Sequence, residues 1–188
     1  VQTIAVADSA QAFNDNYGSH NALDGEVGRS TGPGDTPEYA SAGLGPQTYV
    51  DFDLGSEIQV AGFDWFDRPA TADRTYAFDL IFSTNETIGD GDDVGRSFEN
   101  FDGLMAMSGE FDPPVPARMI RFAVTEASSE TANSGLAEMI FYRSGEAPAV
   151  APSILEAPQS IAKFAGESHT FSVNALGTPP LQYQWQKD

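Results

Sequence analysis

The chain has 188 residues, of which 28 are Asp or Glu and nine are Lys or Arg, so its formal net charge at pH 7 is −19. Because so acidic a chain repels phosphate backbones and anionic lipid surfaces, and because its basic residues are scattered singly, we expect neither nucleic acid nor a membrane surface as partner. The absence of cysteine excludes disulfides, thiolate metal sites and cysteine nucleophiles, and no apolar run approaches the roughly 20 residues that span a bilayer.

Apolar residues alternate with polar ones over short runs bounded by Gly, Pro, Asn and Asp, which predicts an all-β fold. The first clear runs are 49–54 and 58–66, and we expect them to pair as an antiparallel hairpin through a turn at 55–57. Such a hairpin would bring the loops at 32–48 and 67–74 together at one end of a β-sandwich.

Further strands are expected at 75–83 and around 120–124, where the alternation continues. The strand from 75 to 83 would deliver the acidic loop 89–93 to the opposite end of the sandwich, and we interpret that loop as solvated. The last strand, 136–142, is apolar on both faces apart from Glu138, as expected of a strand buried in a sandwich.

The composition changes at a Pro- and Ala-rich stretch that cannot continue a sheet. We therefore predict a first domain at 1–144, a linker at 145–151 and a second module at 152–188.

The second module resembles the opening strands of a bacterial immunoglobulin-like domain, with strands expected at 169–175 and 180–186. The resemblance implies that Trp185 is the buried tryptophan of the third strand. Because 152–188 is far shorter than the about 100 residues of such a sandwich, we interpret it as truncated, and we expect it to be poorly ordered or completed by another chain.

Three motifs of the first domain are informative together: Asn-Ala-Leu-Asp-Gly at 21–25, Tyr-Val-Asp-Phe-Asp-Leu-Gly at 49–55 and Gly-Leu-Ala-Glu-Met-Ile at 135–140. Their order and spacing resemble the discoidin-like (coagulation factor five/eight type C) superfamily, which includes the family 32 carbohydrate-binding modules. The resemblance implies a β-sandwich of the jelly-roll type.

The resemblance also implies a structural Ca²⁺ that ties an early loop to the last strand through carbonyls and carboxylates. Ca²⁺ accepts six to eight oxygen ligands in irregular geometry, which a Gly-containing loop and a strand-end carboxylate can supply. The family expects Thr or Ser five residues after Asp24, where this chain has Arg29. An insertion of one or two residues would give that role to Ser30 or Thr31. In the alternative interpretation, Asp24-Gly25 is only a turn and Glu138 is solvated. The implied ligand set is Asn21, Asp24, Glu26, Thr31, Ala137 and Glu138.

A carbohydrate site is expected where the 32–48 and 67–74 loops meet, because sugar recognition needs a flat aromatic ring and forked donors. Tyr39 would stack on a pyranose, while Arg68 and Arg74 would bind its oxygens beside Glu38. Two arginines could also select a uronate or a sulfated sugar. Alternatively, the arginines form salt bridges with neighbouring aspartates, and Tyr39 only covers the loop.

The sequence shows no nucleophile elbow, zinc-protease motif or phosphate loop. We therefore predict a non-catalytic carbohydrate-binding module with a structural calcium. The acidity and the two lysines favour a secreted, extracellular protein, and the module would target a larger polysaccharide-active chain to its polysaccharide or oligosaccharide. The alternative is a structural or adhesive module of a cell-surface or filament protein.

Overall fold

The computed structural model describes residues 4–25, 38–69, 72–100, 105–145, 153–158, 160–164, 166, 168–176 and 184. The chain divides into two compact units, 1–146 and 147–188, and each is described by itself. The elements of the first unit are β1 (Ala5–Ser9), η1 (Asp15–Tyr17), η2 (Ser19–Leu23), β2 (Tyr39–Ala40), η3 (Gly45–Gln47), β3 (Tyr49–Phe66), β4 (Thr75–Ser83), β5 (Val94–Glu99), β6 (Ala106–Ala127), β7 (Gly135–Leu136) and β8 (Glu138–Arg143).

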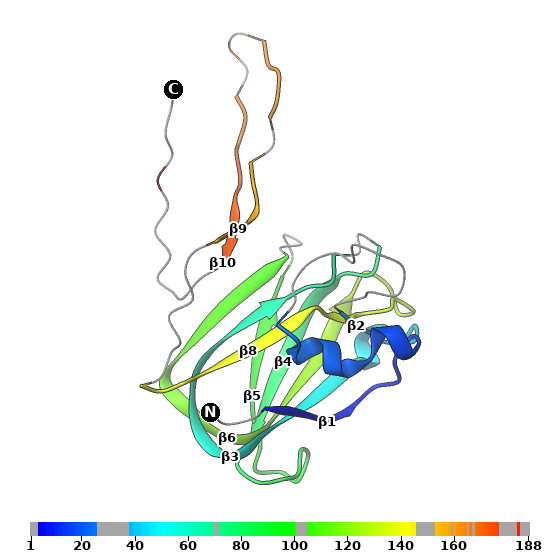
Figure 1. The fold of residues 1–188 in the computed structure, drawn as a ribbon, viewed down its shortest axis with the longest axis vertical. Coiled ribbons are helices and arrows are strands. Elements are labelled where there is room, and N and C mark those ends of the chain that lie inside the picture. Colours follow the sequence, from blue (N-terminus) through cyan, green and yellow to red (C-terminus); the bar gives the residue numbers. More distant parts are fainter. Residues whose placement is uncertain are drawn as a thin grey trace. The chain divides into compact units, whose positions relative to one another are not determined.

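Two long antiparallel strands, β3 and β6, form the frame of the first unit, and Figure 1 shows β3 as a strongly curved ribbon. Both halves of β3 pair with β6, with a register shift between Asp53 and Ile58. Gly55 lies in that interval at φ 76°, a conformation that glycine adopts without steric cost. The predicted hairpin is therefore wrong: 49–54 and 58–66 do not pair with each other but belong to one bent strand.

The bend divides the unit into two facing layers. The first half of β3 pairs with β1, and the second half pairs with β8. The C-terminal half of β6 pairs with β4, which in turn pairs with β5. Strands that pass from one layer to the other through a bend or bulge are a known way to close the corner of a β-sandwich.

The core lies between these layers and is largely aromatic. Phe52 on the first half of β3 contacts Phe141 on β8, with ring centroids 5.4 Å apart. Phe63 on the second half contacts Phe78 on β4, at 6.1 Å. Phe63 and Trp65 are fully buried. The strand predicted at 75–83 is confirmed as β4.

The last predicted strand, 136–142, is divided into β7 and β8. The short strand β7 pairs with β2, which ties the early part of the chain to its end. The approach is so close that a Cβ on Gly135 would collide with the Tyr39 carbonyl, so this position requires glycine. None of the helices in the described part of the chain has the length and apolar character needed to cross a membrane.

The described part of the second unit contains one antiparallel pair, β9 (Ser153–Glu156) with β10 (Asn174–Leu176). The strand predicted at 169–175 is largely irregular, since only its end belongs to β10. Residues 180–183 and 185–186 of the third predicted strand, with Trp185, lie outside the described residues, as do 146–151 of the predicted linker.

Candidate functional site

Arg68 lies two residues after β3, where the segments before β2, between β3 and β4 and between β6 and β7 meet. Its side chain is only 6% exposed, and its Nη2 donates to Glu38 Oε1 at 3.0 Å. Its Nη1 donates to the Asn133 carbonyl and lies 3.8 Å from Asp73 Oδ2. The guanidinium is therefore held by two carboxylates and a carbonyl from three different loops.

The same hydrogen-bond network fixes the loops to each other. The Asn133 amide donates to Asp73 Oδ1 at 3.1 Å, and Asn133 Oδ1 accepts from the Gly43 amide at 2.9 Å. Loops that hydrogen bond through backbone and side chains in this way present neighbouring side chains in a defined geometry, as a binding surface requires.

Two aromatic side chains, Phe13 and Tyr17, form what we call the aromatic rim. The Arg68 guanidinium lies 5.7 Å from the centroid of the Tyr17 ring, within the range of a cation–π contact. Phe13 packs edge-on against Tyr17 at 5.8 Å and is 54% exposed. The Phe13 amide donates to the Ala40 carbonyl at 2.8 Å, which anchors the loop. The aromatic rim thus has an exposed ring, Phe13, packed on Tyr17, which in turn contacts Arg68.

Arg74 is also held within the protein. Its Nη1 lies 3.6 Å from Asp67 Oδ2 and donates to the Met105 sulfur at 2.7 Å. Burial raises the pKa of Asp67 to about 7, although hydrogen bonds from the Arg68 amide and the charge of Arg74 oppose that rise. The sequence left open whether Arg68 and Arg74 bind a ligand or neighbouring aspartates, and in the structure both are paired with carboxylates.

Tyr39 was predicted as the stacking aromatic, and this prediction is wrong. Its ring is fully buried, and its hydroxyl donates to the Ala10 carbonyl at 2.7 Å. Burial raises the pKa of that hydroxyl, so it stays protonated as a donor. Glu38, which was predicted to contact the sugar, is only 8% exposed, and its carboxylate accepts a hydrogen bond from Arg68.

A second cluster lies where the early loop meets β8, and we call it the acidic corner: Asp24, Gly25 and Glu138. The Gly25 amide donates to Glu138 Oε2 at 2.8 Å, so the structure brings this loop and this strand together. Glu138 is 4% exposed. Burial raises its pKa to about 8, the negative charge of Asp24 adds to the rise, and hydrogen bonds from the Gly25 and Asp24 amides oppose it.

The other predicted metal ligands have different positions. Asn21 is buried, and its Nδ2 donates to the carbonyls of Asn16 and Glu38, each at 3.0 Å. The Ala137 amide donates to the Phe66 carbonyl at 2.8 Å, which places residue 137 directly before Glu138 at the sheet edge. Glu26 and Thr31 lie outside the described residues.

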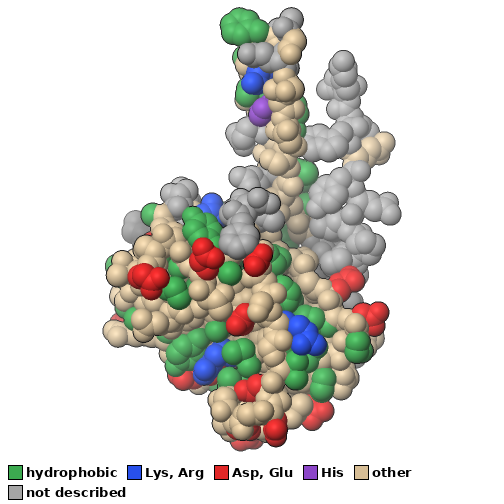
Figure 2. Space-filling model, turned by 180° about the vertical axis from the view of Figure 1, so that it is seen from behind, with side chains coloured by type: hydrophobic (Ala, Val, Ile, Leu, Met, Phe, Trp, Pro, Cys, Tyr) green, Lys and Arg blue, Asp and Glu red, His purple; other side chains and the backbone are tan. Residues whose placement is uncertain are grey.

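Two acidic side chains of the loop 84–93 bind neighbouring groups of the same loop. In the loop 84–93, Asp90 accepts from Asn85 Nδ2 at 2.6 Å and Asp93 from the Gly89 amide at 2.5 Å. Among the described residues, no group of three or more His, Cys, Asp and Glu could hold a metal. Figure 2 shows carboxylates spread over the visible face of the first unit rather than gathered in one patch.

Solved structures of other proteins share this fold. Chitosan-binding module 2 of a chitosanase/glucanase from Paenibacillus sp. IK-5, in complex with chitotriose, is 15% identical, with a TM-score of 0.57 over 75% of this chain and 95% of that one. Discoidin II from Dictyostelium discoideum is 16% identical, with a TM-score of 0.56 over 81% and 58%. The CBM32 of AlyQ, in complex with 4,5-unsaturated mannuronic acid, is 20% identical, with a TM-score of 0.52 over 74% and 93%. The chain therefore has the discoidin-like β-sandwich predicted from its motifs.

No curated protein sequence matches the chain. Residues 2–142, which contain the aromatic rim and the acidic corner, match a family described as a domain of unknown function, DUF7402. Since this match covers nearly all of the first unit and more than half of the chain, the protein belongs to the DUF7402 family.

Proposed function

We propose that the chain is a non-catalytic carbohydrate-binding module of a larger, secreted, polysaccharide-active protein. The observation that carries this proposal is the aromatic rim: an exposed Phe13 ring, packed on Tyr17 and supported by a rigidly held Arg68. An exposed aromatic ring can stack on the apolar face of a pyranose, and a rigid ring loses little conformational entropy when it does so.

The charges around the rim indicate which sugars it would accept. Arg68 is compensated by Glu38 and Asp73, and Arg74 is compensated by Asp67. Neither arginine supplies an uncompensated positive charge for a uronate or a sulfate. The rim therefore favours sugar hydroxyl groups over anionic substituents, which revises the preference inferred from the sequence.

The structural neighbours support a saccharide ligand. One is described as a chitosan-binding module with chitotriose, and another was solved with an unsaturated mannuronic acid. In such proteins, a module holds its chain on an insoluble or polymeric substrate and raises the local concentration of that chain. We extend this role to the present chain by analogy of fold.

A glycan array with the full chain, in the presence of Ca²⁺, tests the proposal. Phe13→Ala should weaken binding to any positive glycan about tenfold, because one stacking contact contributes on the order of 1–1.5 kcal/mol. Phe171→Ala, a change at another exposed phenylalanine (49% exposed) in the second unit, should leave the affinity unchanged. The proposal fails if no glycan binds, or if both variants bind as the unaltered chain does.

We further propose a structural Ca²⁺ at the acidic corner. Two carboxylates meet here, one of them almost fully buried, and burial together with the negative charge of Asp24 raises the pKa of Glu138. A buried carboxylate beside a like charge is costly, and a divalent cation with oxygen ligands would offset that cost. Asp24 and Glu138 would supply the charge, and the carbonyls of Asn21 and Ala137, with Glu26 and Thr31, would supply further oxygens.

Thermal unfolding with and without Ca²⁺ tests this site. A ligand that binds only the folded state stabilises it and so raises the unfolding temperature. At a ligand concentration one hundred times the dissociation constant, the free energy of unfolding increases by about 2.7 kcal/mol. We expect the unaltered chain to respond to Ca²⁺ and Asp24→Asn to respond much less. An equal response of the two chains would reject the assignment.

One observation favours the alternative, a structural or adhesive module. The second unit, which we propose to be a truncated immunoglobulin-like module, exposes apolar side chains beside a two-stranded sheet: Ile154 is 65% exposed and Phe164 is 84% exposed. Exposed apolar groups next to open strand edges favour pairing with another chain. Light scattering across a concentration series separates the alternatives, since assembly without glycan binding would support the adhesive role.

A further inference from the structure

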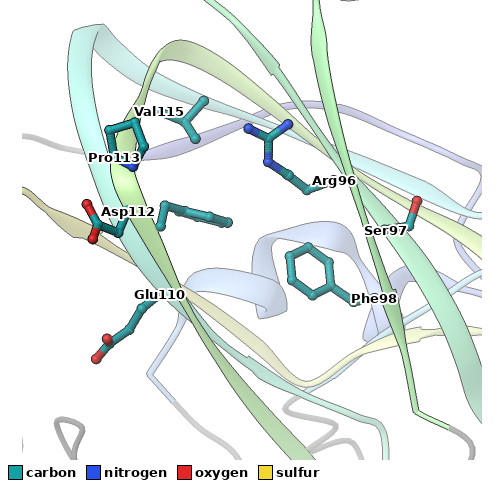
Figure 3. A pocket seen from close by; sticks show the side chains of 8 residues that line it. Arg96, Ser97, Phe98, Glu110, Asp112, Pro113 and Val115 are labelled. Atoms are coloured by element: carbon teal, nitrogen blue, oxygen red, sulfur yellow. The ribbon is translucent and has the colours of Figure 1, made fainter.

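A cleft opens on the flank of the sandwich, between β5 and the N-terminal half of β6. Its volume is about 260 Å³. Figure 3 shows Arg96 and Phe98 extending from β5 toward β6, while Glu110 and Asp112 lie along the outer border on β6. The lining residues are Arg96, Ser97, Phe98, Glu110, Phe111, Asp112, Pro113 and Val115.

The cleft exists because two sheet edges face each other here. β5 is the terminal strand of its layer and pairs only with β4. β4 pairs with β6 only from Met119 onward, so the part of β6 that lines the cleft pairs with β3 alone. In the described part of the chain, no strand closes the gap between the two layers on this side.

The walls of the cleft are aromatic. Phe98 and Phe111 are both half-buried, with ring centroids 6.5 Å apart. Each rests on the fully buried Phe63, Phe98 at 4.7 Å and Phe111 at 5.9 Å. The core therefore fixes both rings, and their unburied parts offer apolar surface to a ligand.

Arg96 differs in its contacts from Arg68 and Arg74, which are paired with carboxylates. It is exposed, its Nη1 donates to the Gly95 carbonyl at 3.0 Å, and it forms no ion pair with any residue that the structure describes. Its guanidinium has donors that remain for a ligand. Glu110 and Asp112 are exposed on the facing strand, and Figure 3 shows their side chains directed away from Arg96 and Phe98.

We propose that this flank cleft is a second saccharide site, distinct from the aromatic rim, which binds a neutral hexopyranose unit of a glycan. The cleft is smaller than the roughly 300–1,000 Å³ typical of ligand pockets, which suits a single sugar ring. Arg96 would donate to hydroxyl oxygens, and the aromatic walls would contact the apolar face of the ring.

Charge decides between neutral and acidic sugars. The charged groups at the border of the cleft are one guanidinium and two carboxylates, and Figure 3 shows the carboxylates on the outer side of β6, directed away from Arg96. The border therefore has a net negative formal charge, and the chain as a whole has a net charge of −19, which repels a polyanion further. Sugar hydroxyl oxygens accept hydrogen bonds from a guanidinium without bringing a negative charge to this surface.

The test is an NMR titration of the ¹⁵N-labelled full chain with cellohexaose and mannohexaose as neutral probes, and with trigalacturonate and glucosamine oligomers as charged ones. We expect a neutral probe to shift the amide signals of β5 and of residues 110–115. Arg96→Ala should weaken this binding about tenfold, because a hydrogen bond from a charged donor is lost. Phe111→Leu, which keeps apolar volume but removes the flat ring, should also weaken it.

Arg118→Ala is the matched control, since it removes one positive charge outside the cleft and should leave the affinity unchanged. The proposal is overturned if no neutral probe shifts these signals, if only a charged probe does, or if Arg118→Ala weakens binding as much as Arg96→Ala. The outcome is separate from that of the aromatic rim, because Phe13→Ala should abolish shifts at the rim and keep those of the flank cleft. Circular dichroism verifies that each variant is folded.

Discussion

Two glutamates, Glu38 and Glu138, are buried to a similar degree at 8% and 4% exposure, yet the protein compensates them differently. Glu38 has an arginine of the same chain at 3.0 Å. Glu138 has a backbone amide and the nearby negative charge of Asp24. A buried carboxylate needs a counter-charge or a proton. Glu38 has that counter-charge in Arg68, whereas none of the ion pairs between described residues involves Glu138, so we infer that Glu138 takes a proton or a cation.

The comparison explains why one cluster is a support and the other a candidate metal site. Arg68 pairs with Glu38 and contacts the Tyr17 ring, so the chain itself supports the aromatic rim. We expect the acidic corner to respond to pH and, under the proposed calcium site, to metal, because burial and the charge of Asp24 raise the pKa of Glu138. The predictions below test this difference, beginning with the largest expected effect.

Replacing Arg68 with Met should be the most destabilising change. It leaves Glu38 buried without a cation, and breaking a buried pair in this way costs about 3–5 kcal/mol. Urea unfolding measures the loss. Adding Glu38→Gln to Arg68→Met should recover part of it, since the uncompensated charge is then removed. If the double variant is as unstable as the sum of the single variants, the pair is not the source of the effect.

Replacing Glu138 with Gln should have effects of opposite sign with and without metal. The pKa of Glu138 is about 8 in the folded state and about 4.3 in the unfolded state. Without metal, the free energy of unfolding therefore falls as pH rises between these values. At pH 9 the Gln variant should be more stable than the unaltered chain. With excess Ca²⁺ the unaltered chain should gain about 2.7 kcal/mol at one hundred times the dissociation constant, and the variant should gain little.

Urea unfolding in EDTA and in Ca²⁺, at pH 5 and pH 9, gives the four values needed. A Gln variant that is less stable than the unaltered chain under all four conditions would contradict an uncompensated charge at this corner.

Asp67 shows an intermediate case, because it has Arg74 at 3.6 Å but keeps a raised pKa of about 7. The folded state binds its proton more tightly than the unfolded state, so its contribution to stability is lost as pH rises from about 4 to 7. Asp67→Asn should remove this part of the pH dependence, which is at most about 4 kcal/mol for a rise of about three pKa units. The difference in unfolding free energy between the two chains, followed from pH 4 to pH 8, measures it. Asp92→Asn, a change at an exposed position, is the control for the loss of a carboxylate.

The sequence predicted the layers of this fold better than their connection. The alternation at 75–83 fixed which residues face the core, because that pattern is local. The bend at Gly55 was interpreted as a hairpin turn, because a glycine with positive φ serves either geometry. Only the choice of β6 as common partner distinguishes the two, and that choice depends on contacts far apart in the sequence.

The candidate site was predictable in its location but not in the orientation of its side chains. The loop at Glu38 and the loop at Arg68 do meet, as expected from the sequence. Which loop aromatic faces solvent depends on the two-residue pairing of β2 with β7, which buries Tyr39 and has no local signal. Phe13, an isolated apolar residue beside Asn14 and Asp15, was the available sign of an exposed ring, and the sequence reasoning passed over it.

The smallest expected effect comes from an exposed ion pair, whose contribution to the free energy of unfolding can be compared with that of the buried pairs. Arg118 Nη1 lies 2.6 Å from Glu86 Oε1, shorter than the contact of Arg68 with Glu38, yet the Glu86 side chain is 72% exposed. Water and salt screen such a pair, so Arg118→Ala should cost less than about 1 kcal/mol, and the cost should shrink further in high salt. Urea unfolding at low and high NaCl measures both. A loss equal to that of Arg68→Met would show that distance rather than burial sets the strength of these pairs, and the contrast between Glu38 and Glu138 would then lose its basis.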